Sequence, residues 1–149
     1  MSESNMRKRL ISALNPLDAV AIESHMRAGI PDVECMVGWI ECKYLPKWVR
    51  GCDTKPVKLK HPLMKAQGVF ANRRTRLGGI SLVCIKVGPR EWFFFDGLEA
   101  RHKIGNMTRP EMHEEAIYYC DSLDEHDLVS WLITLWYNKA AGMYNERQA

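Results

Sequence analysis

Several kinds of functional signature are missing from this sequence. Neither of the glycine-rich patterns that cradle phosphates, Gly-x-x-x-x-Gly-Lys and Gly-x-Gly-x-x-Gly, occurs in it. The longest apolar run, 128–137, is about half of what crosses a bilayer, and the basic amino terminus lacks the apolar run of a secretory signal. We therefore expect no membrane-spanning or targeting segment, and a cytoplasmic location.

Cysteine usage also argues against an exported protein. The chain has 5 cysteines, an odd number, and no two of them have the Cys-x-x-Cys spacing of a zinc ribbon or a redox pair. We expect reduced and mostly buried thiols rather than a disulfide framework. The 149 residues correspond to about one domain, which we expect to span 1–149 with a core at about 15–96 and a helical extension at 97–149.

Charge is distributed unevenly along the chain. The segment 43–76 holds ten Lys or Arg residues and a single acid, Asp53, whereas 111–127 holds seven acids and no Lys or Arg. A concentrated basic segment is what a polyanionic partner requires, because neutralising phosphates releases counterions. The alternative is a solvated, loop-rich surface without a partner.

Turn residues and hydrophobic periodicity divide the first half of the chain. Asn15 as N-cap, Pro16 at the first position and Asp18 in the first turn predict a helix that ends at Gly29. Two short strands should follow, 32–37 and 39–44, with a turn at Gly38. The lysine-rich stretch 45–60 contains prolines and a glycine, which predict a long mobile loop.

A second helix should begin at His61 or Pro62 and stop at Gly78-Gly79, with Leu63, Ala66, Phe70 and Leu77 on its inner side. Two strands, 80–87 and 91–95, then follow, and a final helix occupies about 123–140. That helix should turn Leu128, Trp131, Leu132, Leu135 and Trp136 inward. The segment 98–122 has no clear pattern.

The strand at 39–44 carries the most informative pair of side chains. Because side chains alternate along a strand, Glu41 and Lys43 project from one face, while Ile40, Cys42 and Tyr44 project from the other. With the apolar set in the core, a carboxylate and an ammonium group stand side by side. Such a pair is common as a solvated ion pair, so by itself it leaves a structural role open.

Three other side chains favour a functional reading. Asp32 follows the constrained Gly29-Ile30-Pro31 turn and could lie opposite Glu41. Glu23, on the expected first helix, could add a carboxylate, and Gln67 could hold a phosphate or the water of a metal ion. Two nearby carboxylates repel unless a cation lies between them, and such hard oxygen ligands suit Mg²⁺ or Mn²⁺. Glu23 and Gln67 are equally compatible with exposed surface positions.

The series Gly29-x-Pro31-Asp32, Ile40-Glu41-Cys42-Lys43 and 61–67 (HPLMKAQ), followed by Gly78-Gly79 and a strand, resembles the PD-(D/E)XK nuclease superfamily. Within it the sequence is most similar to VRR-NUC domains and small Holliday-junction resolvases, often phage-encoded. The resemblance covers roughly 17–96. It implies an α/β fold with a restriction-endonuclease-like αβββαβ core, a mixed central sheet flanked by helices and an extra C-terminal helix. Only two strands are evident before the second helix, so the first core strand of the family is short, lost or unrecognised.

The resemblance also implies roles for individual residues. Asp32 and Glu41 match the family's metal-binding carboxylates, Lys43 its catalytic lysine, Gln67 the Gln of the following helix and Glu23 the first-helix Glu. The implied activity is Mg²⁺-dependent hydrolysis of DNA, with Mn²⁺ as a substitute and the backbone carbonyl of Cys42 as a further metal ligand. We expect branched DNA to be bound through its phosphates by nine basic side chains: Lys47, Arg50, Lys55, Lys58, Lys60, Lys65, Arg73, Arg74 and Arg76.

Three further readings stay open at this stage. A protein with the same fold could bind DNA or inhibit a host enzyme without cutting, using the acidic segment 111–127. Trp48, between basic residues, could stack on an unpaired base or pack in the core. An enzyme that makes two symmetric cuts would act as a C2 homodimer, for which the last helix could supply an apolar interface.

Overall fold

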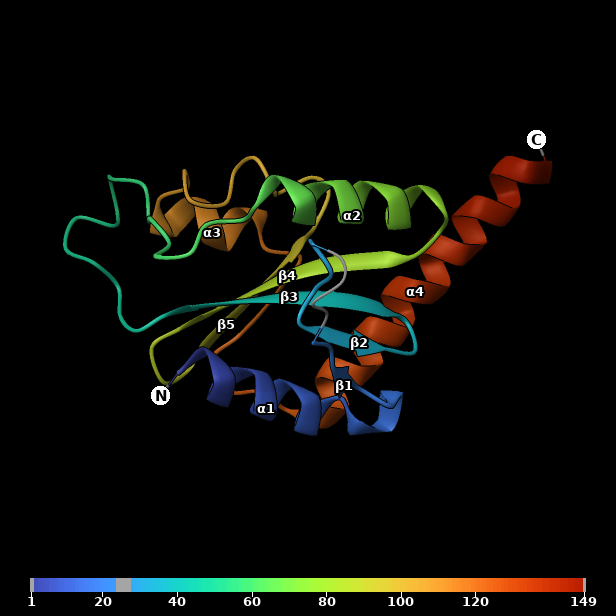
Figure 1. Cartoon of the computed structure of the whole chain (residues 1–149), viewed down its shortest axis with the longest axis horizontal. Coiled ribbons are helices and arrows are strands. Elements are labelled where there is room, and N and C mark those ends of the chain that lie inside the picture. The colour runs from blue at the N-terminus through green and yellow to red at the C-terminus, as the bar shows by residue number, and fades with distance from the viewer. Residues whose placement is uncertain (1, 24–27, 149) are drawn as a thin grey trace.

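The computed structural model describes residues 2–23 and 28–148 and builds them around one sheet. A 3₁₀ turn at Asn15–Leu17 follows the first helix. The remaining elements, of which Figure 1 labels all but β6, are in chain order α1 Glu3–Ala13, β1 Val20–Ala21, β2 Val33–Cys35, β3 Gly38–Leu45, α2 Lys65–Arg76, β4 Ile80–Val87, β5 Glu91–Asp96, α3 Arg109–Glu115, β6 Tyr118–Cys120 and α4 Glu125–Gln148.

The six strands lie in the order β1-β2-β3-β4-β5-β6. β3 and β4 pair in parallel over eight residues each, and every other pair is antiparallel. A parallel pair needs a crossover connection, which here is the basic segment and α2. All eight residues of β4 are buried, as expected for a central strand that is covered on both faces.

Two layers of helices cover the sheet (Figure 1). On one face, Met6 and Leu10 of α1 and Leu128 and Leu132 of α4 pack against the even-numbered residues of β3, β4 and β5. On the other face, the 46–64 segment and α3 contribute Val57 and Met112 to a second apolar cluster with the odd-numbered residues. Glu41 and Lys43 belong to this second face.

The expected helix from Asn15 to Gly29 is wrong. Asn15 starts only a 3₁₀ turn, and Asp18 then adopts the left-handed conformation with φ 54°, which stops helical propagation. Val20 and Ala21 instead pair with β2, so sheet pairing overrides the local helix-start signal. Residues 24–27, the middle of the expected helix, lie outside the described residues.

The first helix is α1, and its N-cap is Ser2, whose side-chain oxygen accepts the backbone N–H of Asn5 at 3.3 Å. β1 is the strand that the sequence pattern did not reveal, because a two-residue strand has no period to detect. The order α1-β1-β2-β3-α2-β4 therefore gives the expected αβββαβ core. The α/β class, the mixed sheet flanked by helices and the extra C-terminal helix are confirmed.

Other expectations were met in part. The strands at 80–87 and 91–95 are confirmed, and α2 stops before Gly78-Gly79 as expected, but it begins at Lys65. Leu77 is 74% exposed and Trp136 is 44% exposed, so neither faces the core. The segment 97–149 is not only helical, since β6 extends the sheet beside β5. Within the described part of the chain, no helix is both long and apolar enough to cross a membrane.

Candidate functional site

Strand register places Asp32 beside Glu41. β2 and β3 pair Val33 with Ile40, so one step further along the ladder Asp32 lies opposite Glu41. Directly opposite residues project from the same face of an antiparallel pair. Ile40 and Cys42 are buried in the cluster beneath α1 and α4, which leaves Glu41 and Lys43 on the opposite face as the sequence predicted.

Glu41 is the centre of a buried polar cluster. Its Oε1 lies 3.2 Å from Lys43 Nζ, and both side chains are only 8% exposed. The same oxygen accepts a hydrogen bond from Nε2 of Gln67. The other end of the Gln67 amide, Oε1, accepts the backbone N–H of Met64 at 2.7 Å, so Gln67 also caps the first turn of α2.

Asp32 is tied to β3 and to α1 by its two oxygens. Oδ2 accepts the backbone N–H of Cys42 at 2.9 Å, in place of a carbonyl on the neighbouring strand. Oδ1 lies 3.4 Å from Nη1 of Arg7 on α1. The carbonyl of Cys42, an expected metal ligand, belongs to the same short stretch of β3 between Glu41 and Lys43, while its thiol is buried on the opposite face.

The electrostatics of Glu41 follow from this crowding. The pKa of Glu41 is raised from 4.5 to about 7, mainly by burial and also by the neighbouring Asp32 carboxylate, while Lys43 acts in the opposite direction. Two carboxylates that disfavour each other's charge are the donor set that a divalent cation stabilises. The residues present therefore fit a Mg²⁺ or Mn²⁺ ion held by Asp32 and Glu41.

Contrary to the expectation, Glu23 does not belong to this cluster. It follows β1 rather than lying on a helix, its side chain is exposed, and Ile22 is the residue whose backbone N–H bonds to Asp32 O, at 2.9 Å. The acid carried by the first helix is Glu3, one turn before Arg7. Glu3 is close enough to contribute the weakest of the effects on the pKa of Glu41.

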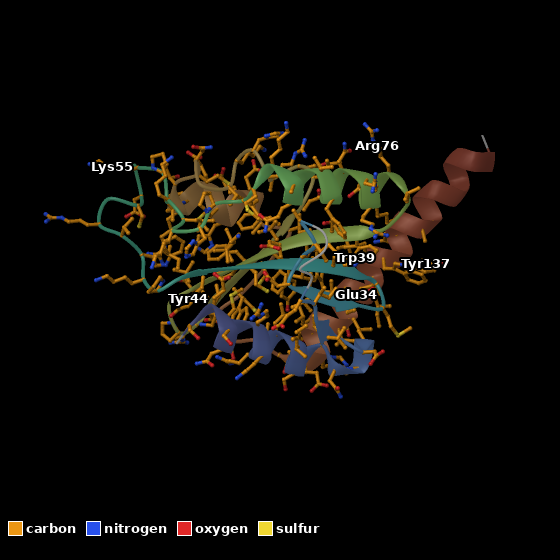
Figure 2. The ribbon with its side chains drawn as sticks, in the orientation of Figure 1. Glu34, Trp39, Tyr44, Lys55, Arg76 and Tyr137 are labelled. Carbon is orange, nitrogen blue, oxygen red and sulfur yellow. The ribbon has the colours of Figure 1, made fainter. Side chains whose placement is uncertain are left out.

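The basic residues are spread along the molecule. Lys55 lies near the tip of the 46–64 segment and Arg76 at the far end of α2 (Figure 2). Eight of the nine side chains expected to contact DNA are exposed, namely Lys47, Arg50, Lys55, Lys58, Lys60, Lys65, Arg73 and Arg76.

Arg74, the ninth, has a different environment. Its guanidinium lies 4.8 Å from the ring centroid of Trp39 and 5.0 Å from that of Phe70, and its Nε is buried without a hydrogen-bond partner. It therefore packs between α2 and β3 and is only partly exposed, and its expected phosphate contact stays a prediction.

The 46–64 segment has no helix or strand, which agrees with the expected loop at 45–60 except that Leu45 ends β3 and that 61–64 were expected in the second helix. The segment is anchored. Cys52 and Val57 are buried, the backbone N–H of Val57 bonds to Met107 O at 2.8 Å, and that of Arg109 bonds to Cys52 O at 2.7 Å. These contacts fix the segment against the 104–109 stretch, on the same face of the sheet as Glu41. Its expected mobility stays a prediction.

Two residues near the site escaped sequence reasoning. Arg7 was hidden because the first helix was expected elsewhere. Arg101 lines a small cavity together with Glu41 and Gln67. A Cβ on Gly68 would come within 2.7 Å of Arg101 Nη1, so the end of the arginine side chain lies directly against α2 at this glycine. Nothing local in the sequence signals a contact between residues so far apart along the chain.

The tryptophans divide between packing and a pocket. Trp92 is fully buried, and Trp131 stacks on Tyr118 with centroids 4.7 Å apart, so both are packing residues. Trp48 is half-buried, and its indole N–H donates to Oε2 of Glu91. It therefore lies at the far end of β3 from the Gly38 turn.

A separate group of potential metal ligands, Asp124, His126 and Asp127, lies exposed at the start of α4, and such exposed groups are common without an ion. In comparisons with known proteins, no family model, curated protein or solved structure matches this chain.

Proposed function

We propose that this chain is a Mg²⁺-dependent endonuclease that hydrolyses phosphodiester bonds in DNA. The observation that supports the proposal is the convergence of Asp32, Glu41, Lys43 and Gln67. They come from three separate segments and meet with the Glu41 carboxylate at their centre. A buried polar cluster of this kind is costly unless it has a purpose or excellent internal pairing.

Each residue has a distinct task in the proposed reaction. Asp32, Glu41 and the Cys42 carbonyl would hold the metal ion, which when bound supplies Lewis-acid activation of water and of the scissile phosphate. Lys43, on the same strand face as Glu41, would offset the negative charge that develops on a phosphoryl oxygen. Gln67 would orient the Glu41 carboxylate through the hydrogen bond it already donates.

Substrate entry requires a local rearrangement. The Glu41 and Lys43 side chains are almost fully covered, and Leu63 and Gln67 line the same small cavity as Glu41. A phosphate therefore reaches Lys43 only when the turn that leads into α2 moves away from the sheet. DNA that bends or opens at a branch would enter such a site more readily than a straight duplex.

The exposed basic side chains favour recognition of DNA structure over sequence. They extend along the 46–64 segment and one side of α2, where they would contact phosphates, which position DNA without reading bases. We therefore propose branched DNA, including four-way junctions, as the preferred substrate. We also propose that the protein acts in the cytoplasm, in keeping with its five free thiols, and in that of a host cell if the chain is phage-encoded.

A C2 homodimer would give the two active sites that symmetric cutting needs. The side chains on α4 that a second copy would cover are Ile133, Trp136 and Tyr137, all exposed in the single chain. Sedimentation of the wild type beside Trp136→Glu tests this. A dimer that the substitution splits supports the proposal, and a wild-type monomer at micromolar concentration contradicts it.

Cleavage of labelled four-way junction, flap, single-stranded and duplex DNA, with Mg²⁺, Mn²⁺ or EDTA, tests the main proposal. The wild type is compared with Glu41→Gln and with Glu34→Gln, a matched control because Glu34 is an exposed acid on the adjacent strand. We expect metal-dependent cutting that falls at least about 100-fold in Glu41→Gln only. Absence of cutting by the wild type would instead indicate a non-catalytic protein that keeps the nuclease fold.

A further inference from the structure

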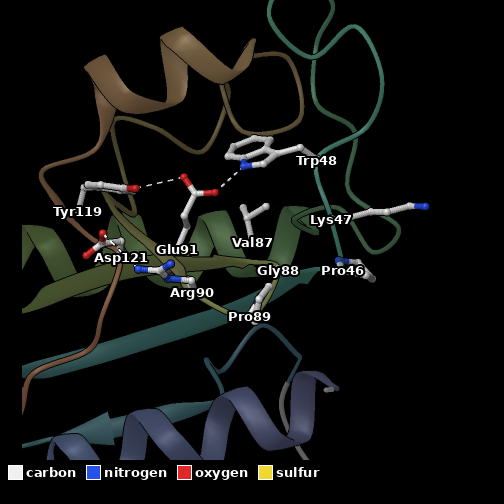
Figure 3. Close-up of a pocket in the computed structure, with 10 residues that line it drawn as sticks. All are labelled: Pro46, Lys47, Trp48, Val87, Gly88, Pro89, Arg90, Glu91, Tyr119 and Asp121. Carbon is white, nitrogen blue, oxygen red and sulfur yellow. Dashed lines mark hydrogen bonds and ion pairs between the residues drawn. The ribbon is translucent and has the colours of Figure 1, made fainter.

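A second cavity lies on the same face of the sheet as Glu41, at the end where β3 finishes and the β4–β5 hairpin turns (Figure 3). Its volume is about 440 Å³. Trp48 and Tyr119 provide aromatic surface, Lys47 provides positive charge, and Arg90 pairs with Asp121 in the same lining at 3.9 Å. Neither the metal ligands nor the remaining residues of the proposed reaction contribute to its lining.

Glu91 organises this cavity. Its carboxylate accepts a hydrogen bond from the indole N–H of Trp48 and another from the Tyr119 hydroxyl at 3.1 Å. Figure 3 shows these two rings on either side of the carboxylate. One acidic group therefore holds two aromatic side chains from segments about seventy positions apart in the chain, which fixes both before any ligand arrives.

The aromatic rings are also supported from behind. The Phe93 ring meets Trp48 edge-on at 5.8 Å and lies 4.9 Å from Tyr119, measured between centroids. Arg109 covers a Trp48 ring at 4.7 Å, and its guanidinium lies 3.7 Å from Glu91 Oε1. The negative charge of Glu91 is thus offset by Arg109, so the cavity does not select for a cation.

We infer that this cavity binds one nucleotide whose base is unpaired, so that it recognises the irregular position in a branched or bulged DNA. The inference rests on the proposed DNA nuclease function. A planar base suits the aromatic surface that Trp48 and Tyr119 present to the cavity, and its phosphate suits Lys47 at the rim. Among the described residues, Oε2 of Glu91 accepts the Trp48 N–H alone, so it retains capacity for an amino group of the base.

The position of the cavity fits this assignment. From Glu41 to Leu45, β3 advances four residues, about 13 Å at the usual rise, and Pro46 then opens the cavity. That length corresponds to roughly four steps of about 3.4 Å along a duplex strand. A strand cut at Glu41 would therefore present an unpaired nucleotide to the cavity a few positions from the cleavage point.

DNA binding in EDTA tests the inference without any requirement for cleavage. Three duplexes of one sequence are compared by fluorescence anisotropy: fully paired, with one extra unpaired nucleotide, and with an abasic residue at that position. We expect the wild type to prefer the unpaired base over the abasic residue by about fivefold or more. Tyr119→Ala and Trp48→Leu should lose this preference, and Met36→Ala, which removes an exposed apolar side chain at the β2–β3 turn outside the cavity, should keep it.

The outcomes separate this inference from the nuclease proposal. Equal affinity of the wild type for the unpaired base and the abasic residue overturns the cavity's role, even if cleavage depends on Glu41. A preference for the unpaired base that survives Tyr119→Ala also overturns the cavity's role. Tyr119 is half-exposed, so we expect this variant to fold. A free mononucleotide that binds as tightly as the bulged duplex would assign the cavity to a small ligand and overturn the DNA assignment. A base preference without metal-dependent cutting would leave the cavity assigned and the nuclease proposal wrong.

Discussion

Arg7 on α1 and Asp32 at the start of β2 form an ion pair, with Nη1 of the arginine 3.4 Å from Oδ1 of the aspartate. The other oxygen of Asp32 is held by the backbone N–H of Cys42. Both side chains are partly exposed, so the attraction is screened by water. Arg7 nevertheless places a positive charge beside the Asp32 carboxylate, which is also a proposed ligand of the metal ion.

Removal of Arg7 should tighten metal binding. In Arg7→Gln, Asp32 loses a competing cation, and we expect the affinity for Mg²⁺, measured by calorimetry without DNA, to rise by about two- to tenfold. Lys8→Gln removes the same charge from an exposed position on α1 and serves as the control. Weaker Mg²⁺ binding in Arg7→Gln would show that Arg7 supports the site rather than competing with it.

Substitution of Gln67 should lower both the stability of α2 and the affinity of the site for Mg²⁺. Its amide donates to Glu41 and accepts the N–H of Met64, so Gln67→Ala removes an orienting group and a helix cap. We expect a 10- to 100-fold loss of Mg²⁺ affinity or cleavage rate, and about 1 kcal/mol of stability. Asn72→Ala on the same helix controls for helix propensity. A variant that loses only stability would assign Gln67 a capping role alone.

Side-chain alternation predicted the Glu41–Lys43 pair correctly, because the apolar set Ile40 and Cys42 defines the buried face of β3 by itself. The short turn at Gly38 then placed Asp32 opposite Glu41, since register follows from the turn. These are local relationships within fourteen residues, and local patterns encode them.

The rest of the site depends on contacts between distant segments. Arg7 reaches Asp32 across 25 positions, and Arg101 reaches Gly68 through a loop that has no hydrophobic period. Asn15-Pro16 carries a true helix-start signal, but pairing of Val20 with Glu34 in the sheet overrides it. Propensity is too weak, at a few tenths of a kcal/mol for each residue, to predict which of two tertiary environments prevails.

The raised pKa of Glu41 predicts an unusual pH dependence of stability. Between its ordinary value of 4.5 and about 7, the folded chain keeps a proton that the unfolded chain has released. The free energy of unfolding therefore falls as pH rises through this window, by about 3 kcal/mol, and stays low above it. Urea denaturation in EDTA from pH 5 to 8 measures the slope.

Glu41→Gln should remove that slope, whereas Glu34→Gln should keep it. Other groups, histidines included, titrate in both proteins, so the difference between the two curves isolates Glu41. Addition of Mg²⁺ at pH 8 should restore stability to the wild type by RT ln(1 + c/Kd), where c is the free Mg²⁺ concentration, and not to Glu41→Gln. Parallel curves for wild type and Glu41→Gln would mean that Glu41 titrates as an ordinary exposed carboxyl group.

Arg73 and Arg74 are adjacent on α2, yet substitution of Arg73 should affect DNA binding and substitution of Arg74 should affect stability. Arg73 is exposed, with Arg76 one turn further on, whereas Arg74 stacks on Trp39 and Phe70. Each phosphate contact contributes about 0.9 to the slope of log affinity against log salt, so Arg73→Gln with Arg76→Gln should flatten that slope by about 2. Arg74→Gln should leave the slope unchanged and cost about 1 kcal/mol of stability through lost stacking.

Titrations of DNA binding at several salt concentrations, paired with urea denaturation, compare the two sets of variants. A slope that flattens in Arg74→Gln would require its guanidinium to leave the Trp39 ring when DNA binds.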